Sequence, residues 1–505
     1  MALTAAAALA TPLLLAAGSP ASATPDPGKA AEHLARKLVH DSSAEGAYKH
    51  LRKLQSIADA NGGNRSAGSP GHEASAKYVH DLLEKAGYQV SYETFDFTFI
   101  ETQAEKLSVV SPAPRDIAIR AMSYTKSTPV GGIRAAVTAV PVDATTGCEP
   151  GDYAAGAFTG KIALIKRGGC TFAEKQATAA GAGAVGAVIY NNTAGDLNGT
   201  LGGPEAGRIP TGGITQADGE ALAAAAAAGE VTLSLDIRQL QEVRTTKNVI
   251  AETKGGDAAN TVMLGSHLDS VAAGPGINDN GSGSAGLLEV ALELAQTHKK
   301  PANKVRFAWW SAEELGLLGS QAYVDELTEA QRKDIKLYLN FDMIASPNFG
   351  QFVYDGDDSD GVGAPAGPEG SAQLEKGITD FLDSQGKPHE GTDFTGRSDY
   401  GPFIAVGIPS GGTFTGAEGI KTADQARKFG GRAGVAYDSC YHAECDNLKN
   451  IDMSAFDTNV DVIANAVGTY AYDLSSLSKQ VPFVSTKGDA GSGGGLHEDH
   501  DHVAE

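Results

Sequence analysis

The sequence predicts an α/β protein in which a mostly parallel, mixed central sheet is covered by helices and interrupted by a second, inserted domain. From about residue 241 onward, apolar strands alternate with helical segments, the rhythm typical of a parallel sheet. A chain of 505 residues is too long for one ordinary hydrophobic core. Between residues 111 and 240 the composition of the sequence changes, and histidine is absent. We therefore expect two domains, the second inserted into the first.

The expected elements follow in chain order. Apolar residues recur at helical spacing over residues 47–60, and "HEASAKYVHDLLEKAG" predicts a second helix that ends at Gly87. The stretch "YQVSYETFDFTFI" alternates in the manner of a strand. In the middle region, "GKIALIKRGGCTFAEKQATAAGAGAVGAVIYNN" predicts strand, turn, helix and strand. After residue 241, "TVMLGS", "KVRFAWW" and "KLYLNFDMI" are the clearest strands.

The net charge and the two ends of the chain limit the functions and locations that the sequence predicts. Lys and Arg number 40 against 62 Asp and Glu, a net charge of -22 that argues against nucleic-acid and membrane partners. Residues 1–23 have an apolar stretch and a small-residue cleavage pattern, which predicts a signal peptide and secretion to the extracellular space. No Lys or Arg precedes that stretch, so a start further upstream or a plain Ala-rich tail stays open. We expect a leader or propeptide at 24–44 and a Gly-, His- and acid-rich tail at 481–505.

Four cysteines permit three pairings. Pairing within each domain, Cys148 with Cys170 and Cys440 with Cys445, is the most economical arrangement. An oxidising compartment favours these disulfides, although "CYHAEC" is also compatible with zinc held through sulfur.

Acidic or imidazole side chains follow three separate strands. His267 comes after "VMLGS", the pair Glu313 and Glu314 after "VRFAWWSA", and Asp342 after "YLNF". The carboxyl ends of parallel strands meet at one edge of a sheet, where ligands collect. We therefore expect these side chains to converge on one site.

The pattern predicts a pair of zinc ions at this site. Two zinc ions need several nitrogen and oxygen ligands and a shared carboxylate. Asp279, in a glycine-rich loop, and His442, in "DSCYHAECD", complete the candidate set. Asp269, two residues after His267, is a candidate to fix the ring's tautomer from behind, although a strand-end cap is the alternative. Glu313 is the candidate general base, although "EE" also suits a solvated helix start.

Six stretches together resemble a known family: "GSHLDSV", "GINDNGSGSAG", "RFAWWSAEELGLLGS", "YLNFDMI", "GRSDYGPF" and "CYHAECD". They resemble the secreted bacterial dizinc aminopeptidases, especially the leucine-preferring, calcium-modulated type. The resemblance covers residues 46–105 and 240–475 and implies a zinc-exopeptidase fold over 45–110 and 241–480. The middle stretch is similar to a protease-associated (PA) domain, which implies a mainly β or α+β insertion at 111–240.

The resemblance also implies a role for each site residue. His267 and Asp342 would bind one zinc, Glu314 and His442 the other, and Asp279 would bridge them. Glu313 would be general base and acid, acting on a water between the two metal ions. Tyr441 would stabilise the oxyanion, and Arg397 would contact the substrate, although a surface arginine is the alternative. A cis peptide would follow Asp279, at Asp279–Asn280. Asp41, Asp457 and Asp461 would bind calcium, although plain solvated acids are the alternative.

These implications predict an enzyme that removes an N-terminal, leucine-like residue from peptides with a free N-terminus. We expect a monomer. The rival interpretations are a zinc carboxypeptidase or glutaminyl cyclase of the same fold, and a non-catalytic binding protein with a PA domain.

Overall fold

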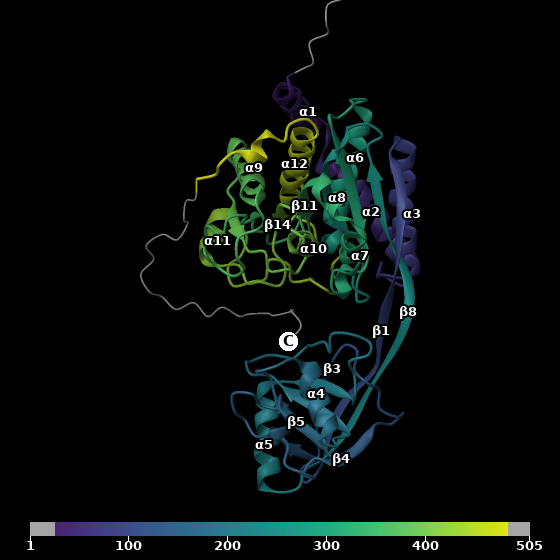
Figure 1. The fold of residues 1–505 in the computed structure, drawn as a ribbon, viewed down its shortest axis with the longest axis vertical. Helices are drawn as coiled ribbons and strands as arrows, with labels where there is room; N and C mark the ends of the chain where they lie inside the picture. The colour runs from purple at the N-terminus through teal and green to yellow at the C-terminus, as the bar shows by residue number, and fades with distance from the viewer. Residues whose placement is uncertain (1–25, 483–505) are drawn as a thin grey trace, which may run out of the picture.

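The computed structural model describes residues 26–482, which form two parts joined by a pair of long strands (Figure 1). These strands are β1 (Gln89–Ser111) and β8 (Thr232–Glu252), and they pair antiparallel from one part to the other. The predicted signal peptide and the tail from residue 483 onward lie outside the described residues. Within the described range, no helix has the length and apolar character needed to cross a membrane.

The larger part contains a mixed sheet with strand order β13-β12-β14-β11-β9-β10-β8. Strands β14, β11, β9 and β10 are parallel neighbours, whereas β8 runs antiparallel to β10, and β12 antiparallel to β14. The strand bounds are β9 (Asp257–His267), β10 (Asn303–Trp310), β11 (Ile335–Phe341), β12 (Phe352–Tyr354), β13 (Glu390–Thr392) and β14 (Ser410–Phe414). The predicted mostly parallel sheet is confirmed.

Helices cover both faces of this sheet. Trp309 and Trp310 are both fully buried but belong to different cores, because successive strand side chains point to opposite faces. Helix ends follow ordinary capping rules: Ser69 caps α3, and Gly87 ends it at φ 100°. The helices are α1 (Pro27–Asp41), α2 (Ala44–Ala60), α3 (Pro70–Ala86), α6 (Gly283–Gln296), α7 (Leu318–Glu326), α8 (Glu329–Asp334), α9 (Ser371–Ser384), α10 (Tyr400–Ala405), α11 (Ala423–Phe429), α12 (Met453–Tyr470) and the short η4 (Ser475–Ser478).

Helix α1 is part of the larger core. Leu34 and Leu38 are buried in the same apolar cluster as the sheet. The helix packs closely on α12, where a Cβ added at Gly468 would lie 2.3 Å from the Cα of Ala35. The segment predicted as a leader therefore contributes to the core while it is present, and its removal stays a prediction.

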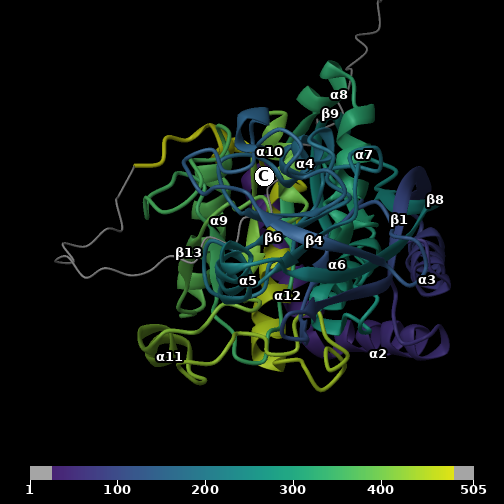
Figure 2. The same cartoon turned by 90° about the horizontal axis from the view of Figure 1, so that it is seen from below.

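The smaller part is an α/β unit between β1 and β8. Its sheet has the order β4-β5-β6-β7-β3, with apolar clusters on both faces. Figures 1 and 2 place it beneath the larger part, on the side where α7 and α10 lie. Its elements are β2 (Arg115–Ile117), β3 (Arg120–Ala121), β4 (Ile133–Ala139), η1 (Pro150–Asp152), β5 (Ile162–Lys166), α4 (Phe172–Gly181), β6 (Gly186–Tyr190), β7 (Thr211–Ile214) and α5 (Gln216–Ala228).

Candidate metal centre

The predicted ligands gather at one edge of the larger sheet. His267 ends β9, Glu313 begins the short turn η3 (Glu313–Leu315) after β10, and Asp342 follows β11. Because these three strands are parallel neighbours, they deliver the three side chains to the same edge. Asp279 joins them from η2 (Ile277–Ser282), the turn between β9 and α6, and its peptide bond to Asn280 is cis.

Two groups of ligand atoms share Asp279. In the first group, Nε2 of His267 lies 3.3 Å from Oδ1 of Asp279 and 3.3 Å from Oδ1 of Asp342. In the second, Nε2 of His442 lies 3.2 Å from Oδ2 of Asp279 and 2.9 Å from Oε2 of Glu314. The two oxygens of Asp279 therefore face two different histidines.

The chemistry and spacing of these atoms fit zinc. Two ligand atoms bound to a tetrahedral zinc at about 2.0–2.1 Å lie about 3.3 Å apart, close to the distances above. Three buried atoms, Nε2 of His267, Oδ1 of Asp342 and Oε1 of Glu314, have no hydrogen-bond partner within the described chain. Buried polar atoms are rarely left without a hydrogen-bond partner. Several such atoms that point toward one another are what a metal ion requires as ligands.

Burial and neighbouring charges shift the pKa values of these side chains. Burial raises the pKa of Glu313 well above its usual value, and nearby Asp342 raises it further. Burial and Asp279 together raise the pKa of Glu314 to about 7. Burial lowers the pKa of His442, but contacts with Asp279 and Glu314 outweigh it and raise that pKa to about 10. Such clustered perturbation is typical of functional sites.

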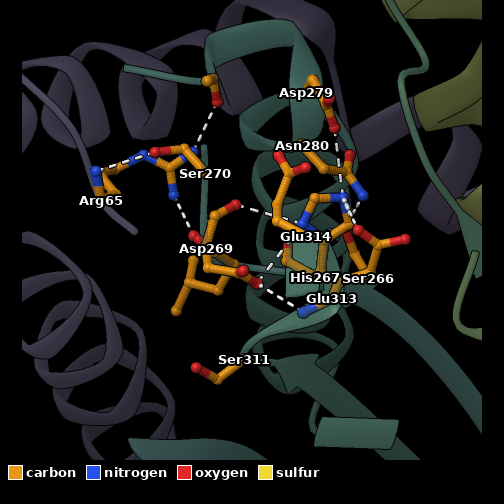
Figure 3. Close-up of polar contacts among 12 residues, drawn as sticks. Arg65, Ser266, His267, Asp269, Ser270, Asp279, Asn280, Ser311, Glu313 and Glu314 are labelled. Carbon is orange, nitrogen blue, oxygen red and sulfur yellow. Dashed lines mark hydrogen bonds and ion pairs between the residues drawn. The ribbon is translucent and has the colours of Figure 1, made fainter. Parts of the chain in front are cut away.

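Asp269 lies behind His267, on the side of the ring nitrogen that faces away from the other candidate ligands. Nδ1 of His267 lies 3.2 Å from the backbone oxygen of Asp269 and 3.6 Å from its carboxylate. The Asp269 carboxylate accepts a hydrogen bond from the backbone N–H of Glu313 at 3.3 Å (Figure 3). Asp269 thus links the His267 segment to the turn that carries Glu313.

That turn is also held by β8. Oδ1 of Asn248 accepts from the backbone N–H of Ser311 at 3.0 Å, and its Nδ2 donates to the carbonyl of Gly319 at 2.9 Å. The hydroxyls of Thr246 and Ser311 lie 2.7 Å apart. Both ends of the segment around Glu313 are therefore fastened to the strand that comes from the smaller part.

Two supporting residues were missed by the sequence analysis. Asp446 accepts hydrogen bonds from the backbone N–H groups of Asn278 and Asp279, at 2.8 and 2.9 Å. The hydroxyl of Ser398 donates to Oδ2 of Asp342 at 2.6 Å. Both lie inside stretches already singled out, "CYHAECD" and "GRSDYGPF", but neither the spacing nor the residue type marked them as partners of a ligand.

Tyr441 and Arg397 form a connected pair beside His442. Nη2 of Arg397 donates to the Tyr441 hydroxyl at 3.1 Å, and Nη1 donates to Glu418 at 2.9 Å. The Tyr441 ring stacks on His442 with centroids 3.8 Å apart. Arg397 is therefore an exposed side chain that is ion-paired with Glu418 and hydrogen-bonded to Tyr441 beside His442.

Among the described residues, the three calcium candidates do not form one compact group of ligand atoms. Asp41 pairs with Lys37 and with His40, whereas Asp457 accepts from the backbone N–H of Ala44 at 3.3 Å. Burial and Asp457 raise the pKa of Asp461 to about 7. In residues 26–482, the acid and histidine groups whose ligand atoms lie within 4.8 Å of one another do not include these three aspartates together.

Both predicted disulfides are present. Cys148–Cys170 lies in the smaller part, and Cys440–Cys445 closes a short loop around His442. His442 itself has a φ of 56°, an uncommon conformation that the closed loop helps to hold.

These two disulfides form a matched pair for an experiment. Loop-closure entropy predicts that a Cys148→Ser/Cys170→Ser variant loses about 3 kcal/mol, and a Cys440→Ser/Cys445→Ser variant about 2 kcal/mol. We nevertheless expect the second variant to lose about 10-fold or more in zinc affinity, because His442 is released, and the first to lose none. Thermal unfolding and zinc competition measure the two effects. Equal zinc affinity in both variants would contradict this role of the short loop.

Comparison with known proteins agrees with this architecture. Residues 248–467 match Peptidase family M28, and residues 134–222 match the PA domain. Leucine aminopeptidase 2 of Trichophyton tonsurans is 48% identical over 428 residues, which cover 85% of this chain and 84% of that protein. An aminopeptidase of Pseudomonas aeruginosa is 46% identical over 437 residues, 83% of this chain and 80% of that protein.

Solved structures are similar as well. The aminopeptidase from Aneurinibacillus sp. strain AM-1 superposes with a TM-score of 0.69 at 30% identity, covering 86% of this chain and 95% of that one. A zinc aminopeptidase from Bacillus subtilis gives a TM-score of 0.60 at 27% identity, over 84% and 94% of the two chains. The chain therefore belongs to Peptidase family M28, with a PA domain inserted between two parts of its peptidase domain.

Proposed function

We propose that this protein is a secreted dizinc aminopeptidase that removes large apolar, leucine-like residues from peptides with a free N-terminus. The observation that carries the proposal is the position of Asp279, whose two carboxylate oxygens face His267 and His442 separately. His267 and Asp342 would hold one zinc, and Glu314 and His442 the other. Names of relatives that are 46–48% identical support the same activity.

Bound zinc ions would polarise the scissile carbonyl and make a water reactive at neutral pH. Glu313 would take the proton of the attacking water, and its position at the edge of the first group, with Oε2 3.8 Å from Nε2 of His267, supports this role. It would then give that proton to the leaving amine. The Tyr441 hydroxyl, held by Arg397, would donate a hydrogen bond to the oxygen on which negative charge develops.

The charges of the site suit a substrate with a free α-amine. Acidic side chains, among them Glu313 and Asp342, gather around His267, and an acidic site would attract the ammonium group of a free N-terminus. A carboxypeptidase instead needs a cation that is free to bind the substrate's carboxylate. Arg397 is already engaged by Glu418, which makes it a poor anchor for a carboxylate.

The decisive assay compares leucyl-p-nitroanilide with its N-acetylated form, before and after treatment with a zinc chelator. We expect turnover of the free-amine substrate alone, its loss on chelation, and recovery when zinc is added back. Turnover of the blocked anilide would favour an endopeptidase, and release of the C-terminal residue from an N-acetylated peptide with a free carboxylate would favour a carboxypeptidase. Cyclisation of an N-terminal glutaminyl peptide would favour a glutaminyl cyclase, and zinc binding without any turnover would favour a binding protein.

Several finer features belong to the same proposal. Two disulfides within the described chain support secretion, because they persist in oxidising compartments. The leucine preference is tested by replacing the leucyl group with alanyl, lysyl and glutamyl groups in the same assay. Sedimentation tests the monomer, and calcium titration of thermal stability tests the site at Asp41, Asp457 and Asp461.

A further inference from the structure

Arg65 is a fully buried charged residue in the loop between α2 and α3. Its guanidinium donates to three backbone carbonyls, those of Leu268, Pro275 and Gly276. Among the described residues, none of its hydrogen bonds goes to a carboxylate. A buried cation normally has an ion-pair partner, so this arrangement needs an explanation.

All three carbonyls belong to one loop. This loop, residues 268–276, connects His267 at the end of β9 to the turn that carries Asp279. The Arg65 backbone adds two contacts, because its N–H donates to the Ser270 hydroxyl at 2.9 Å and its carbonyl accepts from the Ser270 N–H at 3.4 Å (Figure 3). One residue thus fastens both ends and the middle of the loop.

Glycines make part of this loop conformationally permissive, and within the loop the Ser270 hydroxyl donates to the Gly274 carbonyl at 3.1 Å. The loop contains Gly274 and Gly276, and Gly276 adopts a φ of 60°, which glycine tolerates best. A Cβ at Gly276 would lie 3.2 Å from Nη2 of Arg65 and 2.3 Å from the carbonyl oxygen of Asp279. The guanidinium therefore lies directly against the backbone from which Asp279 projects.

We propose that Arg65 is a positioning residue that sets the zinc affinity of the metal centre by fixing the loop between His267 and Asp279. This inference rests on the proposed dizinc function. The contacts of Arg65 act beside those that Asp446 makes to the backbone of Asn278 and Asp279, and together they hold the loop that separates the two ligand atoms, 3.3 Å apart. Residues behind metal ligands commonly change metal affinity by about 10–100-fold when replaced.

The charge of Arg65 acts in the opposite direction. Burial lowers the pKa of Arg65 to about 10, with Asp269 and Asp446 acting to raise it, so the side chain stays protonated at neutral pH. A cation beside the site repels an incoming zinc ion. If charge were the main effect, removal of Arg65 would tighten zinc binding; if the hydrogen bonds are the main effect, removal weakens it. The sign of the change therefore identifies the cause.

The test measures zinc dissociation constants of the metal-stripped, full-length protein by competition with a chromogenic chelator. Arg65→Lys keeps the positive charge but cannot reproduce the three hydrogen bonds of the guanidinium, and Arg65→Met loses both the charge and the hydrogen bonds. We expect the dissociation constant to rise about 10–100-fold in both variants. Ser270→Ala leaves the guanidinium in place and should raise the zinc dissociation constant by a smaller factor. This variant keeps the test decisive if an Arg65 variant misfolds.

Leu233→Ala provides the control, because this buried leucine lies in the apolar cluster of the smaller part. It should lower the melting temperature without changing the zinc dissociation constant. Unchanged or tighter zinc binding in the Arg65 variants, with wild type binding two ions, would overturn the role of Arg65 alone. A wild-type protein that binds no zinc would overturn the dizinc proposal and this inference with it.

Discussion

Replacing Glu313 with glutamine is expected to lower kcat by about 10²–10⁴-fold while both zinc ions stay bound. The amide keeps the size of the side chain but cannot take a proton from the attacking water. Glu313 is buried, and its raised pKa is the perturbation expected of a group that exchanges protons near neutrality. Steady-state kinetics with leucyl-p-nitroanilide and elemental analysis of zinc measure the two quantities separately.

Glu329→Gln is the matched control, since Glu329 is exposed on α8 and pairs with the exposed Lys333, one turn along the same helix. It should leave kcat and KM unchanged. If Glu313→Gln turned over substrate at a rate near that of wild type, Glu313 would not be the base. If it lost zinc as well, its role would be that of a ligand.

Removing the shared carboxylate should have the largest effect on the metal centre. We expect Asp279→Ala to retain at most one zinc ion, because each predicted ion loses a ligand. Activity should fall by at least about 10³-fold, corresponding to several kcal/mol of lost transition-state stabilisation. Zinc content after dialysis, together with kcat/KM at saturating zinc, checks both expectations.

Asp236→Ala is the control in the smaller part, because Asp236 accepts hydrogen bonds from Thr128 and Arg238 and belongs to none of the acid and histidine groups of the described chain that could hold a metal ion. Its replacement should lower stability and leave two zinc ions in place. Two tightly bound zinc ions in Asp279→Ala would show that Asp279 does not bridge them.

The convergence of the ligands was predictable because it follows from strand order. His267, Glu313 and Asp342 each follow an apolar run, and parallel strands necessarily present such positions at one edge. The order of the motifs then indicated Asp279 and His442. The resemblance to a family added the division of ligands between two ions, which spacing alone does not contain.

The residues that hold the candidate ligands in position were harder to predict. Asp446, Ser398 and Arg65 act through hydrogen bonds to backbone or to a ligand's second oxygen, and such contacts depend on how loops fold back. Asp269 was found from its spacing, but the hydrogen bond that its carboxylate also accepts from the backbone N–H of Glu313 was not. Loop geometry sets that contact, and no periodic signal in the sequence records it.

The continuous strand β8 has a consequence for protein engineering. Excision of the PA domain would leave β1 and β8 to be rejoined by a hairpin turn, and their register offers Thr98 opposite Val243 as the point of closure. A closure there keeps Thr246 and Asn248, and with them the fastening of the segment around Glu313. An excision that also removes residues 246–248 would detach the segment around Glu313, the proposed general base, from β8, even though it leaves every proposed metal ligand in the chain.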